Sequence, residues 1–314
     1  MKKILGLFVL IVMLNGCDDG KLTIDTVNFD TVSTYLCGET VYKLKDTEAI
    51  FMKIPAEKNA FLNDETELNT PRIIRIGGDV TFKYRFYDGK VTSDNICLAA
   101  GPIAPKAIKE WVATSGNIEI TTTARYTSTD ATPGQKKIAK YNHHIIIKNL
   151  VFAKPDGTVQ KYDTFTFGDY LTDATSLALN FDPALVARCD SKTKIYNARN
   201  NGIESLSIEN VDPNLIQNTG TITQNVSSTN NKLVYRLYNT SLPTSLTDYF
   251  CGTTPVTPTI KEEWIATEGT IEVVNTTSGG YLHTITLKKV TFKKGNSTFY
   301  YGDAILYGQL LLSE

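Results

Sequence analysis

The sequence predicts an all-β protein made of two tandem antiparallel β-sandwich units of one repeated type. Three observations support this class: an internal repeat covers most of the chain, apolar residues alternate with period two, and four cysteines recur at matched spacings. Length and composition agree, because 314 residues with 41% hydrophobic and 21% charged residues describe a folded globular chain. Strand patterns without long helical periodicities favour a sandwich of the immunoglobulin-like kind.

The only two tryptophans mark the internal repeat. Residues 110–120 read EWVATSGNIEI, and residues 263–273 read EWIATEGTIEV. Further matches pair YRFY at residues 84–87 with YRLY at 235–238, and TFTFGD at 164–169 with TFYYGD at 298–303. Each copy has about the size that one hydrophobic core can serve. We therefore predict a signal peptide over residues 1–16, a tether over 17–21, and repeat units from an internal duplication over 22–173 and 174–314.

Strands are predicted from the spacing of apolar residues. Tyr141, His143 and Ile145 alternate with their neighbours, and residues 281–288 repeat this pattern. The apolar phase then changes at residues 148–149 and again at 288–289, which predicts a β-bulge at both places. Turn residues follow at 154–157 and 293–296, so a hairpin is the expected local unit.

The tryptophans should lie just ahead of a strand in each copy. We expect these strands to begin at Gly116 and Gly269. Residues 257–262 read TPTIKE, which permits either a short helix or an extended segment leading into Trp264.

The N-terminus carries a signal for export and lipid attachment. Lys2 and Lys3 precede an apolar run over residues 4–14 that is too short to span a bilayer, and the sequence LNGC follows at residues 14–17. This ending resembles the lipobox of bacterial lipoproteins, in which the cysteine receives a thioether-linked diacylglycerol. The resemblance implies cleavage before Cys17 and a palmitate-type lipid anchor on Cys17.

The residues that follow resemble the start of outer-membrane lipoproteins of Bacteroidota. Asp18 and Asp19 look like the surface-export signal of that group, and a short solvated tether is the alternative. Asp-Thr-Val at residues 25–27 resembles its O-glycosylation sequon, which implies a glycan on Thr26. These resemblances imply a lipid-anchored protein of the outer membrane, on its periplasmic or cell-surface face.

Four further cysteines permit three disulfide pairings. If each unit folds by itself, Cys37 pairs with Cys97 and Cys189 pairs with Cys251, because these two loops have similar lengths. An exported chain meets an oxidising compartment, in which such bridges persist. Four buried free thiols are the alternative.

Three aromatic residues are candidates for contact with a ligand or partner. Residues 125–140 form a longer connection than residues 278–280 of the other copy, and loops that vary on a fixed scaffold often bind, so Tyr126 is one candidate. A tolerated surface insertion without function is the alternative. Trp111 and Trp264 are the other two candidates, because an exposed indole can stack on a sugar. Since an indole recurs in both copies, packing in the core of each unit is the favoured interpretation.

No catalytic, metal-binding or cofactor-binding pattern is found. The cysteines are too far apart for a zinc site, and neither a nucleophile elbow nor a glycine-rich phosphate loop occurs. His143 and His283 should be core residues, and His144 should be solvated. Six carboxylates were considered for glycoside hydrolysis, but their recurrence in both copies favours structural roles. They are Glu110, Glu119, Asp169, Glu263, Glu272 and Asp303.

We therefore expect a non-enzymatic envelope lipoprotein that acts as a binding or structural module, such as an outer-membrane assembly accessory or an adhesion module. A glycan-binding surface lipoprotein of a polysaccharide uptake system is the alternative, and a hydrolase comes third. The expected partners are the membrane, through Cys17, and an outer-membrane protein or a glycan. Nucleic acid is not expected, because the formal net charge is -1 and no basic cluster occurs.

Overall fold

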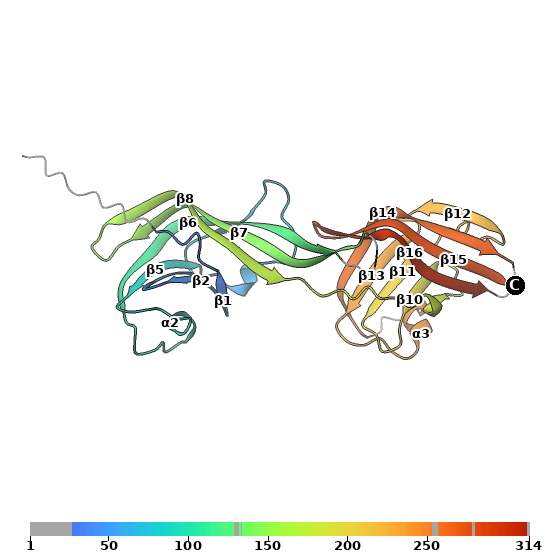
Figure 1. The fold of residues 1–314 in the computed structure, drawn as a ribbon, viewed down its shortest axis with the longest axis horizontal. Coiled ribbons are helices and arrows are strands. Elements are labelled where there is room, and N and C mark those ends of the chain that lie inside the picture. The colour runs from blue at the N-terminus through green and yellow to red at the C-terminus, as the bar shows by residue number, and fades with distance from the viewer. Residues whose placement is uncertain (1–26, 129–131, 133, 253–256, 278–279, 313–314) are drawn as a thin grey trace, which may run out of the picture.

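The computed structural model describes residues 27–128, 132, 134–252, 257–277 and 280–312. Their strands form one antiparallel sheet of 16 strands, so the all-β class is confirmed. The molecule is elongated, with one lobe formed by the first half of the chain and another by the second (Figure 1). Within these residues, no helix combines the length and apolarity needed to cross a membrane. The predicted signal peptide, Cys17 and Thr26 lie outside the described residues.

The first lobe is formed by the elements of the first half of the chain. Its elements are β1 (Tyr35–Cys37), β2 (Thr40–Lys45), β3 (Glu48–Lys53), η1 (Ala56–Lys58), β4 (Arg72–Arg75), β5 (Thr81–Tyr87), α2 (Asp94–Cys97), β6 (Ala107–Ser128), β7 (Lys136–Ala153) and β8 (Val159–Asp173).

The second lobe follows after a connection over residues 174–182. Its elements are η2 (Pro183–Leu185), β9 (Val186–Arg188), β10 (Lys194–Ala198), β11 (Glu204–Glu209), β12 (Gly220–Asn225), β13 (Lys232–Tyr238), α3 (Leu246–Cys251), β14 (Ile260–Thr276), β15 (Tyr281–Lys294) and β16 (Ser297–Leu312).

The strands pair in the same order in both lobes. In the first, β2, β3, β5, β6, β7 and β8 are successive neighbours, and β4 pairs with β6. In the second, β10, β11, β13, β14, β15 and β16 are successive neighbours, and β12 pairs with β14. A contact between β7 and β16, at Lys136 and Tyr300, joins the two arrays into one sheet.

Each lobe has a hydrophobic core of its own, and one tryptophan lies in each. Trp111 is fully buried and packs edge-on against Tyr84, with ring centroids 5.2 Å apart. Trp264 is 3% exposed and packs against Phe299 at 5.1 Å. Burial of about 200 Å² of indole contributes roughly 5 kcal/mol of hydrophobic stabilisation. The core-packing interpretation of both tryptophans is therefore confirmed, and neither indole is an exposed platform.

The predicted bulges are present. The register between β6 and β7 shifts between Ser115 and Asn117, and the register between β14 and β15 shifts between Glu268 and Thr270. On the opposite strands, Asn149 and Lys289 have φ angles of 52° and 51°, in the left-handed region. The extra residue at each bulge returns the following apolar side chains to the core face.

The predicted strand starts were wrong. β6 begins at Ala107 and β14 at Ile260, so both tryptophans lie inside long strands and not ahead of them. Of the two alternatives for residues 257–262, the extended one holds. Trp111 lies opposite Tyr84 of β5, and Trp264 lies opposite Tyr235 of β13. Strand pairing therefore begins before Gly116 and Gly269 are reached.

The register also corrects one of the sequence matches. Gly168 lies opposite Ile145 in the β7–β8 pair, and Gly308, not Gly302, lies opposite Ile285 in the β15–β16 pair. Gly168 and Gly308 also follow the same shift in register. The match of TFTFGD with TFYYGD therefore aligns residues that occupy different places in the two lobes.

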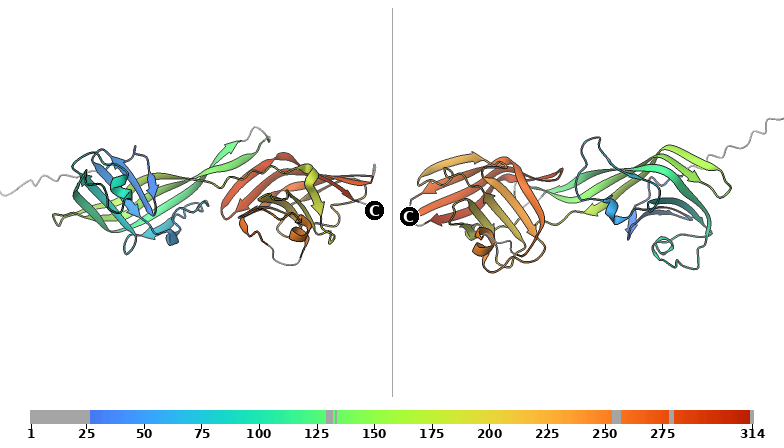
Figure 2. Two further views of the ribbon diagram at one scale, coloured as in Figure 1. Left: turned by 90° about the horizontal axis from the view of Figure 1, so that it is seen from below. Right: turned by 180° about the vertical axis from the view of Figure 1, so that it is seen from behind.

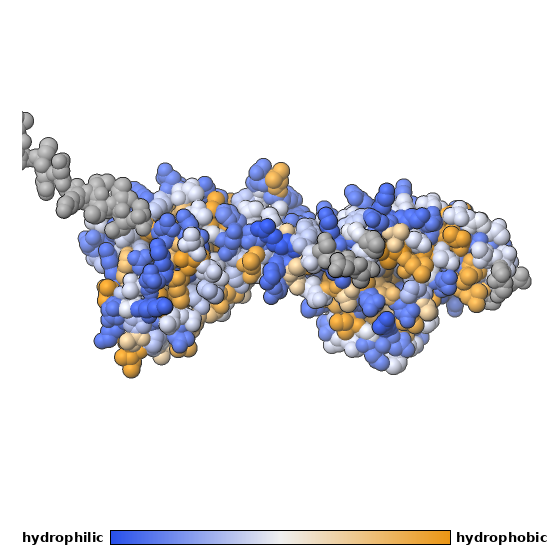
Figure 3. Space-filling model, in the orientation of Figure 1, coloured by the Kyte–Doolittle hydropathy of each residue, from blue (hydrophilic) through white to orange (hydrophobic). Residues whose placement is uncertain are grey.

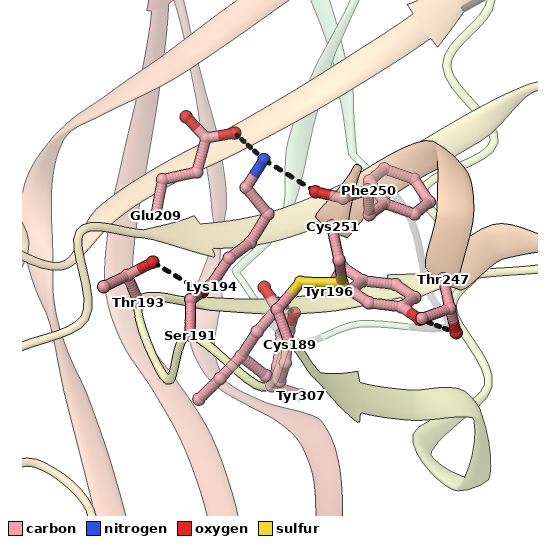
Figure 4. The surroundings of a disulfide bond; sticks show 11 residues. Cys189, Ser191, Thr193, Lys194, Tyr196, Glu209, Thr247, Phe250, Cys251 and Tyr307 are labelled. Atoms are coloured by element: carbon pink, nitrogen blue, oxygen red, sulfur yellow. Dashed lines mark hydrogen bonds and ion pairs between the residues drawn. A yellow bond between two sulfur atoms is a disulfide. The ribbon is translucent and has the colours of Figure 1, made fainter. Parts of the chain in front are cut away.

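Both cysteine pairs form disulfides. Cys37 is bonded to Cys97 and Cys189 to Cys251, with Cα atoms 5.8 and 5.5 Å apart. Figure 4 shows the second bridge, which ties the end of α3 to the loop before β10. Lys194 donates from Nζ to the carbonyl of Phe250 at 3.1 Å. The predicted pairing within each half is thus the one that the structure has.

The described residues of the 125–140 stretch reach the second lobe. β6 continues to Ser128 and β7 starts at Lys136, and this hairpin reaches from the first lobe to the second in both views of Figure 2. Tyr126 donates from its hydroxyl to the carbonyl of Thr298 at 3.0 Å. Ile138 packs against the second core. Tyr126 therefore contributes to the contact between the lobes.

A second contact between the lobes centres on Asp64, in the connection between β3 and β4. Its Oδ1 accepts hydrogen bonds from the backbone of Asn296 at 2.9 Å and of Ser297 at 3.0 Å, and from the hydroxyl of Ser297 at 2.8 Å. Tyr141 donates to the same hydroxyl at 3.2 Å, and Ser297 is fully buried. The tight β15–β16 turn is therefore held by the first lobe at the narrow waist visible in Figure 3.

Candidate functional site

Five of the six carboxylates that are candidates for hydrolysis, all but Glu119, form ion pairs or hydrogen bonds within the scaffold. Glu110 pairs with Lys83 at 2.9 Å and with Arg85, and Glu263 pairs with Arg236 at 2.7 Å. The pairs of Glu272 with Lys288 at 2.7 Å, Asp169 with His144 at 2.8 Å and Asp303 with the Tyr300 hydroxyl at 2.7 Å follow the same pattern. None of the six lines either cavity described below.

The buried histidine of the first lobe has partners on both ring nitrogens. In His143, Nδ1 lies 2.9 Å from the Thr122 hydroxyl and Nε2 lies 2.9 Å from the Thr172 hydroxyl. The Phe61 ring packs edge-on against the imidazole at 5.4 Å. Burial, with a smaller contribution from the positive charge of Arg72, lowers the pKa of His143 to about 4. This site is filled and closed by protein atoms.

The buried histidine of the second lobe has a partner on one ring nitrogen only. His283 is 2% exposed, and its Nδ1 lies 2.7 Å from Oδ1 of Asn275. The Asn275 amide nitrogen donates to the carbonyl of Gly220 at 3.1 Å, which turns the amide oxygen toward the imidazole. His283 therefore carries its proton on Nδ1. Its Nε2 is buried, is left with a lone pair, and has no hydrogen-bond partner among the described residues.

His283 is one of the residues that line a cavity of about 850 Å³ in the second lobe. Ligand sites of small molecules commonly have volumes of 300–1,000 Å³. Apolar and polar side chains both contribute to the wall. Its lining residues are Arg188, Ser191, Lys192, Thr193, Val211, Asp212, Pro213, Ile216, Gln217, Asn218, Tyr281, His283 and Leu312.

The positive charge at this cavity comes chiefly from Arg188, at the end of β9. Its partial burial lowers the pKa of the guanidinium, and no carboxylate contributes to that shift. The same charge adds to burial in lowering the pKa of His283, so the imidazole is neutral at pH 7. A partly buried guanidinium that has no acidic partner among the described residues is a ready site for an anion.

Two local differences account for the cavity beside His283 and the closed site around His143. β3 and β4 are joined by residues 54–71, which include Phe61, whereas β11 and β12 are joined by the shorter residues 210–219. Thr172 lies opposite Tyr141, and Leu312 lies opposite Tyr281. Among the described residues of the second lobe, no aromatic ring and no hydroxyl take the places that Phe61 and Thr172 have beside His143.

A smaller cavity of about 290 Å³ lies between the lobes and is lined by Trp264. Its charged groups already have partners. Glu262 pairs with Lys294 at 2.9 Å, accepts from the Trp264 indole at 3.0 Å, and accepts from the Thr175 hydroxyl. This cavity is therefore part of the contact between the lobes.

The described residues contain no group of three or more histidine, cysteine or carboxylate side chains that could hold a metal ion. No protein-family model matches the chain, and comparisons with curated proteins and with solved structures find no significant match. Sequence reasoning missed the cavity of the second lobe. The available signal was the histidine shared by both copies, together with the different lengths of the connections around it.

Proposed function

We propose that this protein is a non-enzymatic envelope lipoprotein that binds a small ligand in the cavity at His283. The observation that carries the proposal is a cavity of about 850 Å³ lined by the partly buried guanidinium of Arg188. The corresponding histidine in the first lobe lies in a site that Phe61 and Thr172 close.

The two lobes are, in this proposal, duplicated β-sandwich units with different tasks. Identical pairing order, matched disulfides and matched tryptophans support a common origin. In the first unit, protein side chains close the site around His143, and Asp64 and the β6–β7 hairpin contact the second unit. The second unit has a shorter connection beside its histidine and takes the ligand.

The position of the cavity fits a protein tethered at its N-terminus. The first described residues belong to the first lobe, and β16 runs to the extremity of the second lobe (Figure 1). Leu312, the last residue of β16, lines the cavity. A lipid on Cys17 would therefore place the ligand site at the end of the molecule remote from the membrane. The contacts between the lobes would keep it there.

A glycan is the ligand class that this proposal favours over an outer-membrane protein partner. Burial of Trp111 and Trp264 removes the stacking platforms that the sequence suggested. The cavity offers another site, with apolar walls for the carbon skeleton of a sugar and polar groups for its hydroxyls. Roles in outer-membrane assembly or adhesion remain predictions of the sequence.

Lipid anchoring is tested by replacing Cys17 with serine. The unmodified protein should sediment with membranes and incorporate radiolabelled palmitate, and the Cys17→Ser protein should do neither. Label on Cys17→Ser would contradict the lipobox assignment.

Ligand binding is tested by a thermal-shift screen of the mature protein against a library of mono- and oligosaccharides and small metabolites. Ile216→Trp is the comparison variant, because Ile216 lines the cavity and an indole there would occupy it. Ligands of the cavity should raise the melting temperature of the unmodified protein and leave that of Ile216→Trp unchanged. Shifts that are equal in both proteins, or absent throughout, would contradict the proposed function.

A further inference from the structure

An apolar loop protrudes from the first lobe between α2 and β6. Residues 98–105 read LAAGPIAP, and residues 98–104 are all exposed. Ile103 is 89% exposed and Leu98 is 55% exposed. Figure 3 shows hydrophobic residues at the lowest point of this lobe, where Figure 1 shows the connection between α2 and β6. Single exposed apolar side chains are common on protein surfaces, whereas a continuous apolar loop marks an interaction surface.

The base of this loop is fixed. Cys97, directly before the loop, is bonded to Cys37 of β1. At the other end, the carbonyl of Pro105 accepts a hydrogen bond from the side-chain amide of Asn95 in α2 at 3.3 Å. Because both ends are held, the loop loses little conformational entropy when its tip binds a partner.

The corresponding connection of the second lobe is polar. Cys251 matches Cys97 and Pro258 matches Pro105, and residues 252–257 between them read GTTPVT. The two lobes share their strand order and their disulfides. An apolar sequence at this place is therefore not required for the fold of the repeated unit.

The loop belongs to the lobe that the N-terminal tether enters. Val27, the first described residue, packs against the core of the first lobe. The chain from Cys17 to Val27 can extend over about 33 Å at most, which is about the diameter of a small domain. A lipid on Cys17 would thus keep the first lobe, together with this loop, within reach of the membrane surface.

We propose that residues 98–105 insert into the lipid bilayer beside the anchor and hold the first lobe against the membrane. This inference rests on the proposed envelope lipoprotein and is independent of the ligand of the cavity. Leu98 and Ile103 enter the boundary between headgroups and acyl chains. Tyr35 and Leu36 of β1, next to the disulfide, are 52% and 45% exposed and extend this surface. Tyrosine is enriched at this depth of a bilayer.

The contact is weak by itself and effective beside an anchor. Transfer of one leucine-sized side chain out of water changes a binding equilibrium on the order of 10- to 100-fold, so two of them give half-maximal binding at about 1 mM lipid. That affinity is too low to retain Cys17→Ser on washed membranes. Tethering supplies an effective concentration in the millimolar range, so the anchored loop stays bound.

Vesicle flotation tests the loop without the anchor. The protein is the mature chain with Cys17→Ser, and the vesicles contain phosphatidylcholine and phosphatidylethanolamine, which have no net charge. Half-maximal binding should occur at about 1 mM lipid, and Ile103→Asp should raise that concentration at least about 10-fold. Thr257→Asp, at the matched connection of the second lobe, should leave binding unchanged. Equal losses in the two variants, or release of the parent protein by high salt, would overturn the proposal.

A quenching measurement tests the loop in the anchored protein. The five cysteines of the chain are Cys17 and the two disulfide pairs, so Ile103→Cys provides a single thiol for a fluorophore. In proteoliposomes, nitroxide-labelled lipids should quench a fluorophore at residue 103 and not one attached to Thr257→Cys. Equal quenching at both positions would overturn the proposal. Shielding of residue 103 from water without quenching by lipid, together with a dimer in analytical ultracentrifugation, would make a second copy of the chain the occupant instead.

The anchor and the loop fail in different ways. If palmitate is incorporated but the loop fails both tests, the loop assignment is wrong and the proposed lipoprotein stands. If the mature chain floats as expected but palmitate is not incorporated, the anchor is wrong and the loop stands as a membrane contact.

Discussion

Gly295→Ala tests how firmly the two lobes are joined. Gly295 lies in the β15–β16 turn with a φ angle of +58°, and a Cβ added there would overlap the carboxylate of Asp64. Gly157 lies in the corresponding turn of the first lobe with a φ angle of +82°, and a Cβ there would meet nothing within 4 Å. Gly157→Ala is therefore a matched control for the cost of the backbone conformation alone.

The magnitude follows from the contacts that Asp64 makes. Alanine at either turn costs about 1 kcal/mol through the left-handed backbone conformation. Displacing Asp64 also removes three hydrogen bonds to its Oδ1, each contributing about 1 kcal/mol at this partly exposed site. Gly295→Ala should thus lower the free energy of unfolding by about 4 kcal/mol, and Gly157→Ala by about 1 kcal/mol.

Urea unfolding followed by tryptophan fluorescence measures both losses. In the Gly295→Ala background, Asp64→Ala should lower the free energy of unfolding by almost nothing more. In the Gly157→Ala background it should cause its full loss of stability, because Asp64 is in contact with residue 295 and not with residue 157. Equal destabilisation by the two glycine substitutions, or simple additivity of Asp64→Ala with both, would refute the account of this interface.

Two further predictions concern stability. Replacing Cys37 and Cys97 together by serine should lower the free energy of unfolding by about 4 kcal/mol, because the disulfide closes a loop with a sequence separation of 60 residues; an unchanged urea midpoint would contradict this. His143 has a pKa lowered from 6.5 to about 4 in the folded protein, so the unfolded chain binds more protons between these values. Stability should therefore fall by on the order of 3 kcal/mol as pH drops from 6.5 to 4, and the same pH series on His143→Gln should lack that part of the slope.

Local patterns predicted several features correctly. The disulfide partners followed from the similar lengths of two loops, and the bulges at Asn149 and Lys289 followed from a change in the phase of apolar residues. Both depend on spacing along a single stretch of chain or on the comparison of two stretches. These spacings can be seen in the sequence alone, because strand periodicity determines which side chains share a face.

Features that depend on contacts between distant segments were not predicted. The hairpin at Tyr126 has the composition of a surface loop, and its contacts with Thr298 and Tyr300 of the second lobe became visible only in the structure. The matched Gly-Asp pairs at residues 168–169 and 302–303 suggested one register, whereas strand pairing places Gly308 opposite Ile285. Similar turn residues occur at many places in β-proteins, so a short match is a weak guide to register.

The cavity was missed for a related reason. A buried histidine was expected in each lobe, and both are buried. The residues around the two histidines differ. Phe61 and Thr172 close the site at His143, whereas Leu312 and the shorter connection over residues 210–219 leave the site at His283 open. The shared histidines and the different lengths of these connections are visible in the sequence, but only the folded chain shows that the connections lie beside the histidines.

The most direct test of the central claim is an NMR measurement of the imidazole nitrogens in the mature protein. The chain has three histidines, and His144 is exposed and hydrogen-bonded to Asp169, so the spectrum is simple to assign. The free protein should show His283 as the Nδ1–H tautomer, and a ligand that Ile216→Trp excludes should shift the His283 resonances while those of His143 stay in place. An Nε2–H tautomer of His283, or shifts in His143 of the same size, would contradict the account.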